Sequence, residues 1–485
     1  MTNVANLLRN IAVVQSLGNL QINIQNIHFD SRKITPQDLF VAVKGTQVDG
    51  HDYINKAIDQ GANVIVCEEL PDDIQETITY IQVASSAKAL GWLASNYYDN
   101  PSQKLKLVGI TGTNGKTTTV TLLYQLFQKL GYQVGLLSTI QNYIHETVVP
   151  ARLTTPDPLE LNRLMAEMVQ VGCTHCFMEV SSHAVVQGRI AGLQFAGAAF
   201  TNISHDHLDF HETFANYIEA KKQFFDALPA SAFALVNADD KRGMVMLQNT
   251  RAQVQRTFAL KQMADFKARV VESTLQGLFV EVEGVEVWFQ MIGYFNAYNL
   301  LGIYGIAMLL GEDSTEVLTI LSGLKSAPGR FEKVIGNTGT TGVVDYSHTP
   351  DALENVLQTI FELRQDGQKI ITVVGCGGNR DATKRPIMAR IACQYSDLVI
   401  LTSDNPRFED PMQILEDMKK GVAIDEEPKT SVIENRREAI EQACALAGAQ
   451  DIVLVAGKGH ETYQEIEGVR HSFDDRLVLN DFLNK

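Results

Sequence analysis

The sequence predicts an α/β protein of three domains, in which mainly parallel sheets are built from strand–helix–strand units. Its length of 485 residues is enough for two to four domains. Short apolar runs alternate with amphipathic stretches along the chain, which is the pattern of right-handed βαβ units. Polar motifs follow many of these runs. Because ligands of open α/β sheets bind at the carboxyl ends of strands, this placement also favours the α/β class.

The three predicted domains differ in character. Residues 1–103 form a small α/β domain with strands in DLFVAVKG, NVIVCEE and TITYIQV, and no phosphate-binding loop. Residues 104–331 form the central domain, a parallel-sheet domain with a phosphate-binding loop (P-loop), which ends at an Ala-Pro-Gly-Arg turn. Residues 332–485 resume the β-then-α alternation and are expected to form a Rossmann-like domain.

Composition excludes several classes of protein. The net charge of −16 repels a phosphate backbone, so we expect no nucleic-acid binding. No run of about 18 apolar residues occurs, and the N-terminus lacks a signal-peptide pattern, so we expect a cytoplasmic protein without a membrane span. Cys173 and Cys176 form a single CxxC with no second pair, which favours a buried strand position over a zinc site.

A strand-like run, LKLVGI, leads into a glycine-rich loop and then into the helical stretch VTLLYQLFQKLG. This setting suits a P-loop, in which backbone N–H groups and a helix N-terminus face polyphosphate. Lys116 would neutralise the β- and γ-phosphates of ATP, and Thr117 would place its hydroxyl on Mg²⁺. The general pattern has glycine where this chain has Ile110, so a strand–helix turn without a ligand is the alternative.

Glu179 and His207 each follow a predicted strand and are expected to share a divalent cation, Mg²⁺ or Mn²⁺. Lys221 lies in the helical stretch YIEAKKQFF, and a protonated lysine is not a metal ligand. The residue types alone leave two alternatives open: His207 as a buried structural histidine, and Lys221 with Lys222 as a solvated helix face.

Several motifs resemble the Mur ligase family in order and spacing over nearly the whole chain. They are TGTNGKTT, LTTPDP, EVSSH, TNISHDHLDFH, GYFNAYNLL, GRFE, DYSHTPDAL, GCGGNRD, DNPR and GKGHE. The resemblance is greatest to the member that adds the third residue of the cell-wall peptide. The family's own P-loop variant also accommodates Ile110.

The resemblance implies an ATP-dependent ligase of peptidoglycan synthesis. ATP would phosphorylate the free D-Glu carboxylate of UDP-MurNAc-L-Ala-D-Glu, and the amine of meso-diaminopimelate would attack the acyl phosphate. Lys221 would be carbamylated by CO₂ and so become a ligand of a second Mg²⁺, with Lys222 as the alternative. His183 would orient substrate or be structural. A monomer is the family default.

The resemblance also implies the nucleotide contacts. In the central domain they are Gly112, Thr113, Asn114, Gly115, Lys116, Thr117, Thr118, Asn296 and Arg330. Asp345 of the third domain would hold the ribose. Asn299 lies one helical turn from Asn296 and would cap or brace that turn. Because these contacts straddle a domain boundary, ATP is expected to favour closure of the third domain.

The UDP-sugar peptide is expected to contact the first two domains. The matched positions are Ser31, Thr46, Gln47 and Val48, followed by Thr154, Thr155, Ser181, Gln187 and Arg189. Arg189 suits an anionic group on physical grounds. The other positions rest on the resemblance.

The amine donor is expected to contact the third domain at Arg380, Asp404, Asn405, Pro406, Arg407, Gly457 and Glu461. The motif DNPR resembles ligases that add meso-diaminopimelate. Arg407 and Arg380 would be the carboxylate partners, and a guanidinium can hold the distal carboxylate of that donor and would repel the bare ammonium of lysine. Glu461 and the Gly457 carbonyl would take the distal ammonium. Asn379 departs from the aspartate more common in relatives and puts the geometry around Arg380 in doubt.

Three alternatives remain at this stage. The first is the same ligase with L-lysine as the donor, against which Arg407 argues. The second is a folylpolyglutamate synthase-like ligase, which would lack the first domain. The third is a P-loop NTPase switch without ligase activity, which would need neither the Glu179, His207 and Lys221 cluster nor the motifs beyond residue 370.

Overall fold

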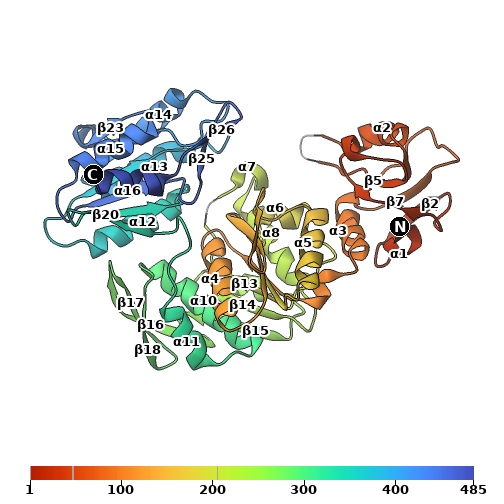
Figure 1. Ribbon diagram of the computed structural model, residues 1–485, viewed down its shortest axis with the longest axis horizontal. Coiled ribbons are helices and arrows are strands. Elements are labelled where there is room, and N and C mark those ends of the chain that lie inside the picture. The colour runs from red at the N-terminus through yellow and green to blue at the C-terminus, as the bar shows by residue number, and fades with distance from the viewer. Residues whose placement is uncertain (1, 46–47, 205) are drawn as a thin grey trace.

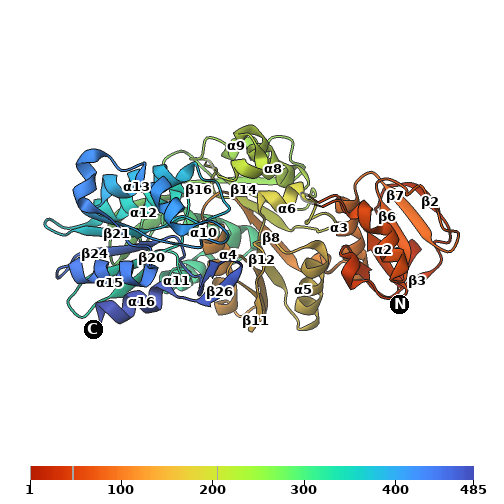
Figure 2. The ribbon, with the colours of Figure 1, turned by 90° about the horizontal axis from the view of Figure 1, so that it is seen from above.

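The computed structural model describes residues 2–45, 48–204 and 206–485, which form three lobes in a row (Figure 1). The first lobe (red) and the third lobe (blue) lie at opposite ends of the central lobe in both views (Figure 1, Figure 2). The predicted α/β class is confirmed. The expected boundaries stay predictions; the first falls inside η3 (Pro101–Lys104) and the second directly before β19 (Glu332–Ile335). No helix of the described ranges is long and apolar enough to cross a membrane.

The first lobe is built on a five-stranded sheet in the order β2-β7-β6-β5-β4. β2 is antiparallel to β7, and the other neighbours are parallel. Alternate strand residues pack under α3 on one face and under α2 on the other. The elements are β1 (Thr2–Asn3), α1 (Val4–Leu7), β2 (Val13–Leu17), β3 (Asn23–Ile24), β4 (Ile27–His28), η1 (Ser31–Lys33), β5 (Asp38–Val41), η2 (Gly50–Tyr53), α2 (Ile54–Asp59), β6 (Ala62–Cys67), β7 (Thr79–Val83), α3 (Ser86–Tyr97) and η3.

The central lobe contains an 11-stranded sheet in the order β11-β10-β9-β12-β8-β13-β14-β15-β16-β17-β18. Its core lies on both faces, under α4, α10 and α11 on one and under α5 and α8 on the other. The elements are β8 (Lys106–Thr111), α4 (Lys116–Lys129), β9 (Val134–Leu137), β10 (Gln141–Ile144), β11 (Thr147–Pro150), α5 (Pro158–Gln170), β12 (His175–Glu179), α6 (Ser182–Val186), β13 (Gly197–Phe200), α7 (Leu208–His211), α8 (Phe214–Asp226), β14 (Phe233–Asn237), α9 (Gly243–Leu247), β15 (Val254–Ala259), β16 (Phe266–Thr274), β17 (Gly277–Val282), β18 (Val285–Phe289), α10 (Tyr294–Leu310) and α11 (Ser314–Ser322).

The central sheet is parallel from β9 to β16, and both of its ends are antiparallel. A two-residue turn joins β17 to β18, with φ of 49° at Glu283 and 83° at Gly284. Positive φ at both central residues is the type I′ geometry that suits the twist of a hairpin. The expectation of mainly parallel sheets is therefore confirmed, and antiparallel strands extend this sheet at its two ends.

The third lobe has a six-stranded sheet in the order β19-β20-β24-β21-β22-β23, parallel except for β19. Helices α12–α14 pack on one face and α15 and α16 on the other. The elements are β19, β20 (Thr341–Asp345), α12 (Pro350–Leu363), β21 (Ile370–Val374), α13 (Lys384–Tyr395), β22 (Leu398–Leu401), α14 (Pro411–Lys419), η4 (Ile424–Lys429), β23 (Thr430–Val432), α15 (Arg436–Leu446), β24 (Ile452–Ala456), β25 (Tyr463–Ile466), β26 (Val469–Ser472) and α16 (Asp475–Leu483).

The polar motifs occupy the predicted edges. In the central lobe they follow β8, β12 and β13, which are neighbours in the sheet, and in the third lobe they follow β20, β21, β22 and β24, which are also neighbours. Cys176 lies in β12 and is fully buried, as expected for a strand position. The two sets of motifs therefore form two polar edges, one on each lobe.

Candidate active site

The glycine-rich loop connects β8 to α4 in the middle of the central sheet. Gly115 is the N-cap of α4 with φ 86°, and a Cβ there would lie 2.4 Å from Asn299 Oδ1. A Cβ on Gly112 would lie 1.9 Å from Thr201 Oγ1. The loop therefore has no room for side chains at these two positions, and its helix N-terminus is suited to an anion. Ile110 is buried in β8 beneath α4, so the tight turn begins only at Gly112.

Two lysines from different helices donate to the same carbonyl oxygen of this loop. Lys116 Nζ lies 2.9 Å from Gly112 O and 2.8 Å from Thr113 O. Lys221 Nζ, from α8, lies 2.9 Å from Gly112 O and 4.4 Å from the centre of the Tyr217 ring. Burial lowers the pKa of Lys116, whereas the charges of Glu179 and Asp206 raise it. Burial, together with the charge of Lys116, lowers the pKa of Lys221 well below its ordinary value.

The neighbouring lysine has different surroundings. Lys222 Nζ donates to both carboxylate oxygens of Asp226, at 2.6 and 2.7 Å, and to Gln248 O at 2.7 Å. Lys222 is therefore held in an ion pair with Asp226, away from the P-loop carbonyl that Lys221 contacts.

Glu179, at the end of β12, has one satisfied and one unsatisfied oxygen. Its Oε1 accepts hydrogen bonds from Thr117 Oγ1 at 2.9 Å and from the N–H of Thr139 at 2.8 Å. Its Oε2 is buried and has no partner in the described part of the chain. A buried carboxylate oxygen without a partner is costly unless a ligand occupies it. Thr117 and Glu179 together therefore offer hard oxygen ligands that fit Mg²⁺.

The structure places His207 beside other aromatic rings. Its ring lies 4.9 Å from that of His183, and its Nε2 lies 3.4 Å from Asp206 Oδ2. His207 has φ 54° and a side chain that is 43% exposed. Outside residues 1, 46–47 and 205, no three His, Cys, Asp or Glu side chains form a group that holds a metal. The sharing of a cation by Glu179, His207 and Lys221 stays a prediction.

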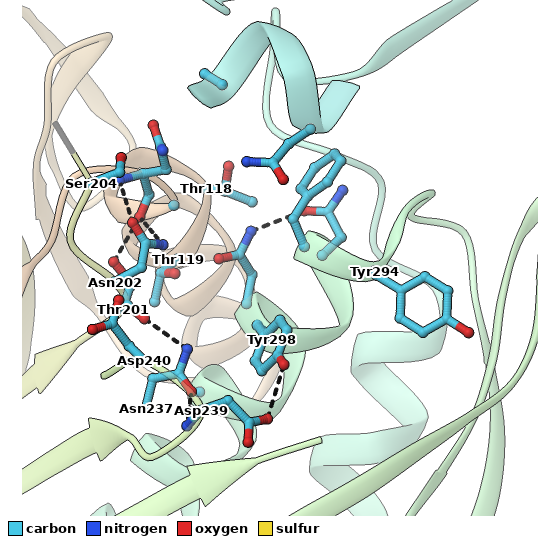
Figure 3. Close-up of a pocket in the computed structure, with 18 of the residues that line it drawn as sticks. Thr118, Thr119, Thr201, Asn202, Ser204, Asn237, Asp239, Asp240, Tyr294 and Tyr298 are labelled. Carbon is cyan, nitrogen blue, oxygen red and sulfur yellow. Dashed lines mark hydrogen bonds between the residues drawn. The ribbon is translucent and has the colours of Figure 1, made fainter. Parts of the chain in front are cut away.

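A cavity of about 690 Å³ lies between the central and third lobes. The P-loop, the ends of β13 and β14, and the first turns of α10 line one side of it, and residues of α12 line the other. Figure 3 shows Thr118 and Thr119 of α4 near Thr201, Asn202 and Ser204, with Tyr294 and Tyr298 of α10 farther along the cavity. The volume and the mixture of backbone, hydroxyl and amide groups suit a nucleotide.

Arg330 connects the P-loop to the third lobe. Its Nη2 donates to Thr117 Oγ1 at 3.2 Å, and its guanidinium lies 4.5 Å from the centre of the Tyr346 ring. Its Nε is buried without a hydrogen-bond partner among the residues described. Burial raises the pKa of the neighbouring Asp345, although the Arg330 charge opposes this. The site therefore holds an arginine with an unused donor beside the cavity, which suits a phosphate group.

Two asparagines of α10 support the same wall of the cavity. Asn296 is buried and its Nδ2 donates to Ile292 O at 2.9 Å. Asn299 Nδ2 donates to Asn296 Oδ1 at 3.0 Å, and Asn299 Oδ1 faces Gly115. Asn299 therefore braces both Asn296 and the P-loop.

Five positions predicted to contact the UDP-sugar peptide gather beyond Glu179. Thr155 Oγ1 donates to Glu179 O at 2.8 Å and accepts from the N–H of Ser181 at 3.1 Å. Arg189 Nη1 donates to Thr155 O at 2.7 Å, and its Nε donates to Gln187 Oε1 at 2.9 Å. The fifth position, Thr154, is held by a 3.1 Å hydrogen bond from Thr139 Oγ1. These residues come from three segments and meet at one edge of the sheet.

The predicted donor-binding residues lie on three neighbouring loops of the third lobe. Arg407 Nη1 donates to Gly378 O at 2.7 Å, which joins the loop after β22 to the loop after β21. Asn379 has φ 52°, and its Oδ1 accepts from the N–H of Phe408 at 3.1 Å. Asparagine tolerates this left-handed conformation, so Asn379 helps to hold the Arg407 loop. Arg380 is exposed at the rim.

The motif after β24 completes this site. Glu461 Oε2 accepts from Asn405 Nδ2 at 2.8 Å and from Lys458 Nζ at 2.9 Å. Gly457 has φ 119°, and its ideal Cβ position lies 2.5 Å from Asp404 Oδ2, so a side chain has no room there. Asn405 is 3% exposed and Asp404 is 7% exposed, so both are fixed parts of the floor of the site.

Comparisons with known proteins agree with this geometry. Three family descriptions match consecutive parts of the chain: the Mur ligase catalytic domain at residues 23–98, the Mur ligase middle domain at 110–307 and the Mur ligase glutamate ligase domain at 329–459. A protein from Cytophaga hutchinsonii, a UDP-N-acetylmuramoyl-L-alanyl-D-glutamate–2,6-diaminopimelate ligase, is 59% identical over 483 residues, which is 99% of each chain. This chain belongs to the Mur ligase family.

Solved structures agree with the family assignment. A ligase structure of the same name as the Cytophaga relative covers 99% of this Mur ligase and 98% of its own chain, at 31% identity and a TM-score of 0.69. The match to a folylpolyglutamate synthase structure from Thermotoga maritima covers 76% of this chain and 90% of the other, at 17% identity and a TM-score of 0.58. The latter similarity concerns the fold alone.

Several residues of this Mur ligase site were not predicted from its sequence. Asp351 Oδ2, at the start of α12, accepts from Asn114 Nδ2 at 2.6 Å and from Ser204 Oγ at 3.0 Å. Asn202 Oδ1 accepts from the N–H of Asn114 at 2.9 Å. Asn202 lies in the motif TNISHDH and Asp351 in DYSHTPDAL, two of the motifs that resemble the family. Their place in these motifs was the sequence signal that could have predicted them as site residues.

The first lobe of this Mur ligase lies far from the cavity, beyond the central lobe (Figure 1). Ser31 is 6% exposed at the start of η1, and Val48 is 55% exposed. The predicted contacts at Thr46 and Gln47 lie outside the described residues. Ser31 and Val48 therefore belong to a different lobe from the P-loop, whereas the predicted peptide-binding positions of the central lobe lie beside Glu179.

Proposed function

We propose that this Mur ligase adds meso-2,6-diaminopimelate to the D-Glu carboxylate of UDP-MurNAc-L-Ala-D-Glu, with hydrolysis of ATP to ADP and phosphate. The observation that carries the proposal is the pairing of two edges: a P-loop with Lys116 and Glu179 on one lobe, and the Arg407 and Glu461 loops on another. The name of the relative at 59% identity supports the same donor and acceptor.

The proposed reaction has two steps. The D-Glu carboxylate oxygen attacks the γ-phosphorus of ATP, ADP leaves, and an acyl phosphate forms. The neutral amine of the donor then attacks the acyl carbon, and the tetrahedral intermediate releases phosphate and leaves an amide. Lys116 and Arg330 offset charge on the phosphoryl oxygens, and the lobes hold the reactants in contact. Mg²⁺, when bound at Thr117 and Glu179, would neutralise phosphate charge in the same way.

The alternatives are weakened by separate observations. A folylpolyglutamate synthase-like ligase does not account for the first lobe, since that solved structure covers 76% of this chain. L-Lysine as donor leaves the guanidinium of Arg407 without a carboxylate. We further propose action as a monomer in the cytoplasm, where ATP and UDP-activated precursors occur.

One assay tests the proposal and its alternatives together. Phosphate release from ATP is measured with UDP-MurNAc-L-Ala-D-Glu and with meso-diaminopimelate, L-lysine or no amine. We expect release and tripeptide formation with meso-diaminopimelate, and little of either with lysine. Equal release without an amine would support the NTPase switch and contradict the ligase.

Replacement of Arg407 by alanine tests the choice of donor. A charge-assisted hydrogen bond contributes about 1.5–3 kcal/mol, so kcat/KM for meso-diaminopimelate is expected to fall about 10- to 100-fold. The value for L-lysine should stay the same or rise, because a repelling cation is removed. Arg390→Ala, an exposed arginine on α13, is the matched control. An unchanged ratio between the two donors would reject Arg407 as the selecting residue.

We also propose that Lys221 is carbamylated and that the carbamate holds a second Mg²⁺. Support comes from the lowered pKa of Lys221, since CO₂ reacts with the neutral amine, and from its position at the P-loop. Lys221→Ala is expected to lower kcat roughly 10²- to 10³-fold, as loss of one charge-stabilising group does, with partial recovery on addition of acetate or formate.

The same change at the adjacent position is the control for Lys221. Lys222→Ala removes a lysine of the same helix that is paired with Asp226, and it should leave kcat nearly unchanged. Intact-mass measurement of the unaltered protein in bicarbonate should show the added mass of CO₂, and this should disappear in Lys221→Ala. Loss of the added mass in Lys222→Ala instead would assign the carbamate to Lys222.

A further inference from the structure

Lys458 has an unusual position for a lysine. It follows β24 in the GKGHE motif, and its side chain is 0% exposed. Its ammonium donates to Asn405 Oδ1 at 3.0 Å and to Glu461 Oε2 at 2.9 Å. It also lies 5.5 Å from the centre of the Tyr463 ring. A charge buried in this way costs free energy unless its partners are well placed, so the arrangement of those partners reveals its role.

The two partners of Lys458 are fixed relative to one another. Asn405 Oδ1 also accepts from the N–H of Glu465 at 2.9 Å, so two donors determine which way the amide faces. Asn405 Nδ2 then donates to Glu461 Oε2 at 2.8 Å. Lys458, Asn405 and Glu461 are thus joined in one hydrogen-bond network through Glu461 Oε2 and Asn405 Oδ1. Each hydrogen bond in it restricts the rotation of the side chains that it joins.

The other oxygen of Glu461 is left available. Within the described chain no hydrogen bond to Glu461 Oε1 is found, and the side chain is 15% exposed. Oε1 is therefore held at the edge of the donor site while Oε2 is occupied from within. Without the ammonium of Lys458, Glu461 Oε2 and Asn405 Oδ1 would each keep only one of the two donors that orient them.

We propose that Lys458 is a positioning residue of the donor site, which holds Asn405 and Glu461 so that Glu461 Oε1 receives the distal ammonium of the donor. This inference rests on the proposed function, because the ligand is the distal end of meso-diaminopimelate. Lys458 itself does not contact the donor. It acts through Glu461, whose rigid placement reduces the entropy lost on binding.

The test compares two donors that differ at one group. 2-Aminopimelate has the chain and both carboxylates of diaminopimelate but no distal amine. In Lys458→Met, KM for meso-diaminopimelate is expected to rise about 10- to 100-fold, the value of one charge-assisted hydrogen bond. KM for 2-aminopimelate and KM for ATP should stay close to those of the unaltered protein. Lys419→Met, an exposed lysine of α14, is the matched control.

Each outcome has a definite meaning. If KM rises equally for both donors, or for neither, Lys458 is a structural charge and the inference is overturned. If Lys458→Met does not fold, Lys458→Gln, which keeps a donor to Asn405 but removes the charge, is measured with the same two donors and judged by the same criterion. If the unaltered protein ligates neither donor, the proposed function itself fails, which is distinct from failure of the Lys458 inference.

Discussion

Replacement of Lys116 by methionine is expected to lower kcat for tripeptide formation roughly 10³-fold, the upper range for loss of a single charge-stabilising group. Methionine keeps the length of the side chain but removes the ammonium that lies against the Gly112 and Thr113 carbonyls. Phosphoryl transfer depends almost entirely on positioning and charge neutralisation, so no other group of the loop replaces it. Tripeptide formation and phosphate release at saturating substrates are the measurements.

Lys129→Met is the matched control, because Lys129 is an exposed residue at the other end of α4. It should keep the kcat of the unaltered protein. If Lys116→Met retained more than about a tenth of the activity, the P-loop would have to be removed from the proposed mechanism.

Replacement of Arg436 by methionine is expected to destabilise the third lobe by about 3–5 kcal/mol, because it leaves a carboxylate buried without its partner. Arg436 and Asp475 are both 0% exposed. Arg436 Nε and Nη2 each lie 2.7 Å from an oxygen of Asp475, and Nη2 also donates to Ala456 O at 3.0 Å. The pair joins the first residues of α15 and α16 to the end of β24, next to the GKGHE motif.

Urea denaturation and calorimetry of the whole chain measure this loss. Arg437→Met is the control, since Arg437 is adjacent on α15 but 52% exposed, and it should change stability little. The double change Arg436→Met with Asp475→Leu should recover most of the loss, because it removes both buried charges. Equal stability of the Arg436 and Arg437 variants would show that the ion pair contributes nothing.

Much of the fold and of the candidate site could be predicted because the chemistry lies at the ends of apolar strands. Lys116 follows β8 and Glu179 ends β12, which are direct neighbours, so proximity follows from the parallel arrangement alone. Arg407 and Glu461 follow β22 and β24, which are both parallel to β21 between them, so their loops lie at the same edge of the sheet. Short-range patterns are thus enough where adjacent parallel strands carry the residues.

What the sequence did not predict depends on contacts between separate segments. The antiparallel ribbon of β16–β18 extends the central sheet, and its turn carbonyl at Leu275 accepts from Lys333 of the third lobe at 3.1 Å. The burial of Lys458 depends on the loop after β22, whose Asn405 contacts the ammonium from outside the GKGHE motif. Neither feature has a periodicity or spacing that a single sequence displays, because Leu275 lies far from Lys333 along the chain and Asn405 lies far from Lys458.

The carboxyl group of Asp351 is shared by Asn114 of the P-loop and by Ser204 of the loop after β13. Both bonds end on the same oxygen, and Asp351 belongs to the third lobe. A swing of that lobe away from the central one would therefore break both contacts at the same moment rather than one after the other. We expect the lobe to move between two discrete positions, so that release of ADP and phosphate coincides with a single opening event.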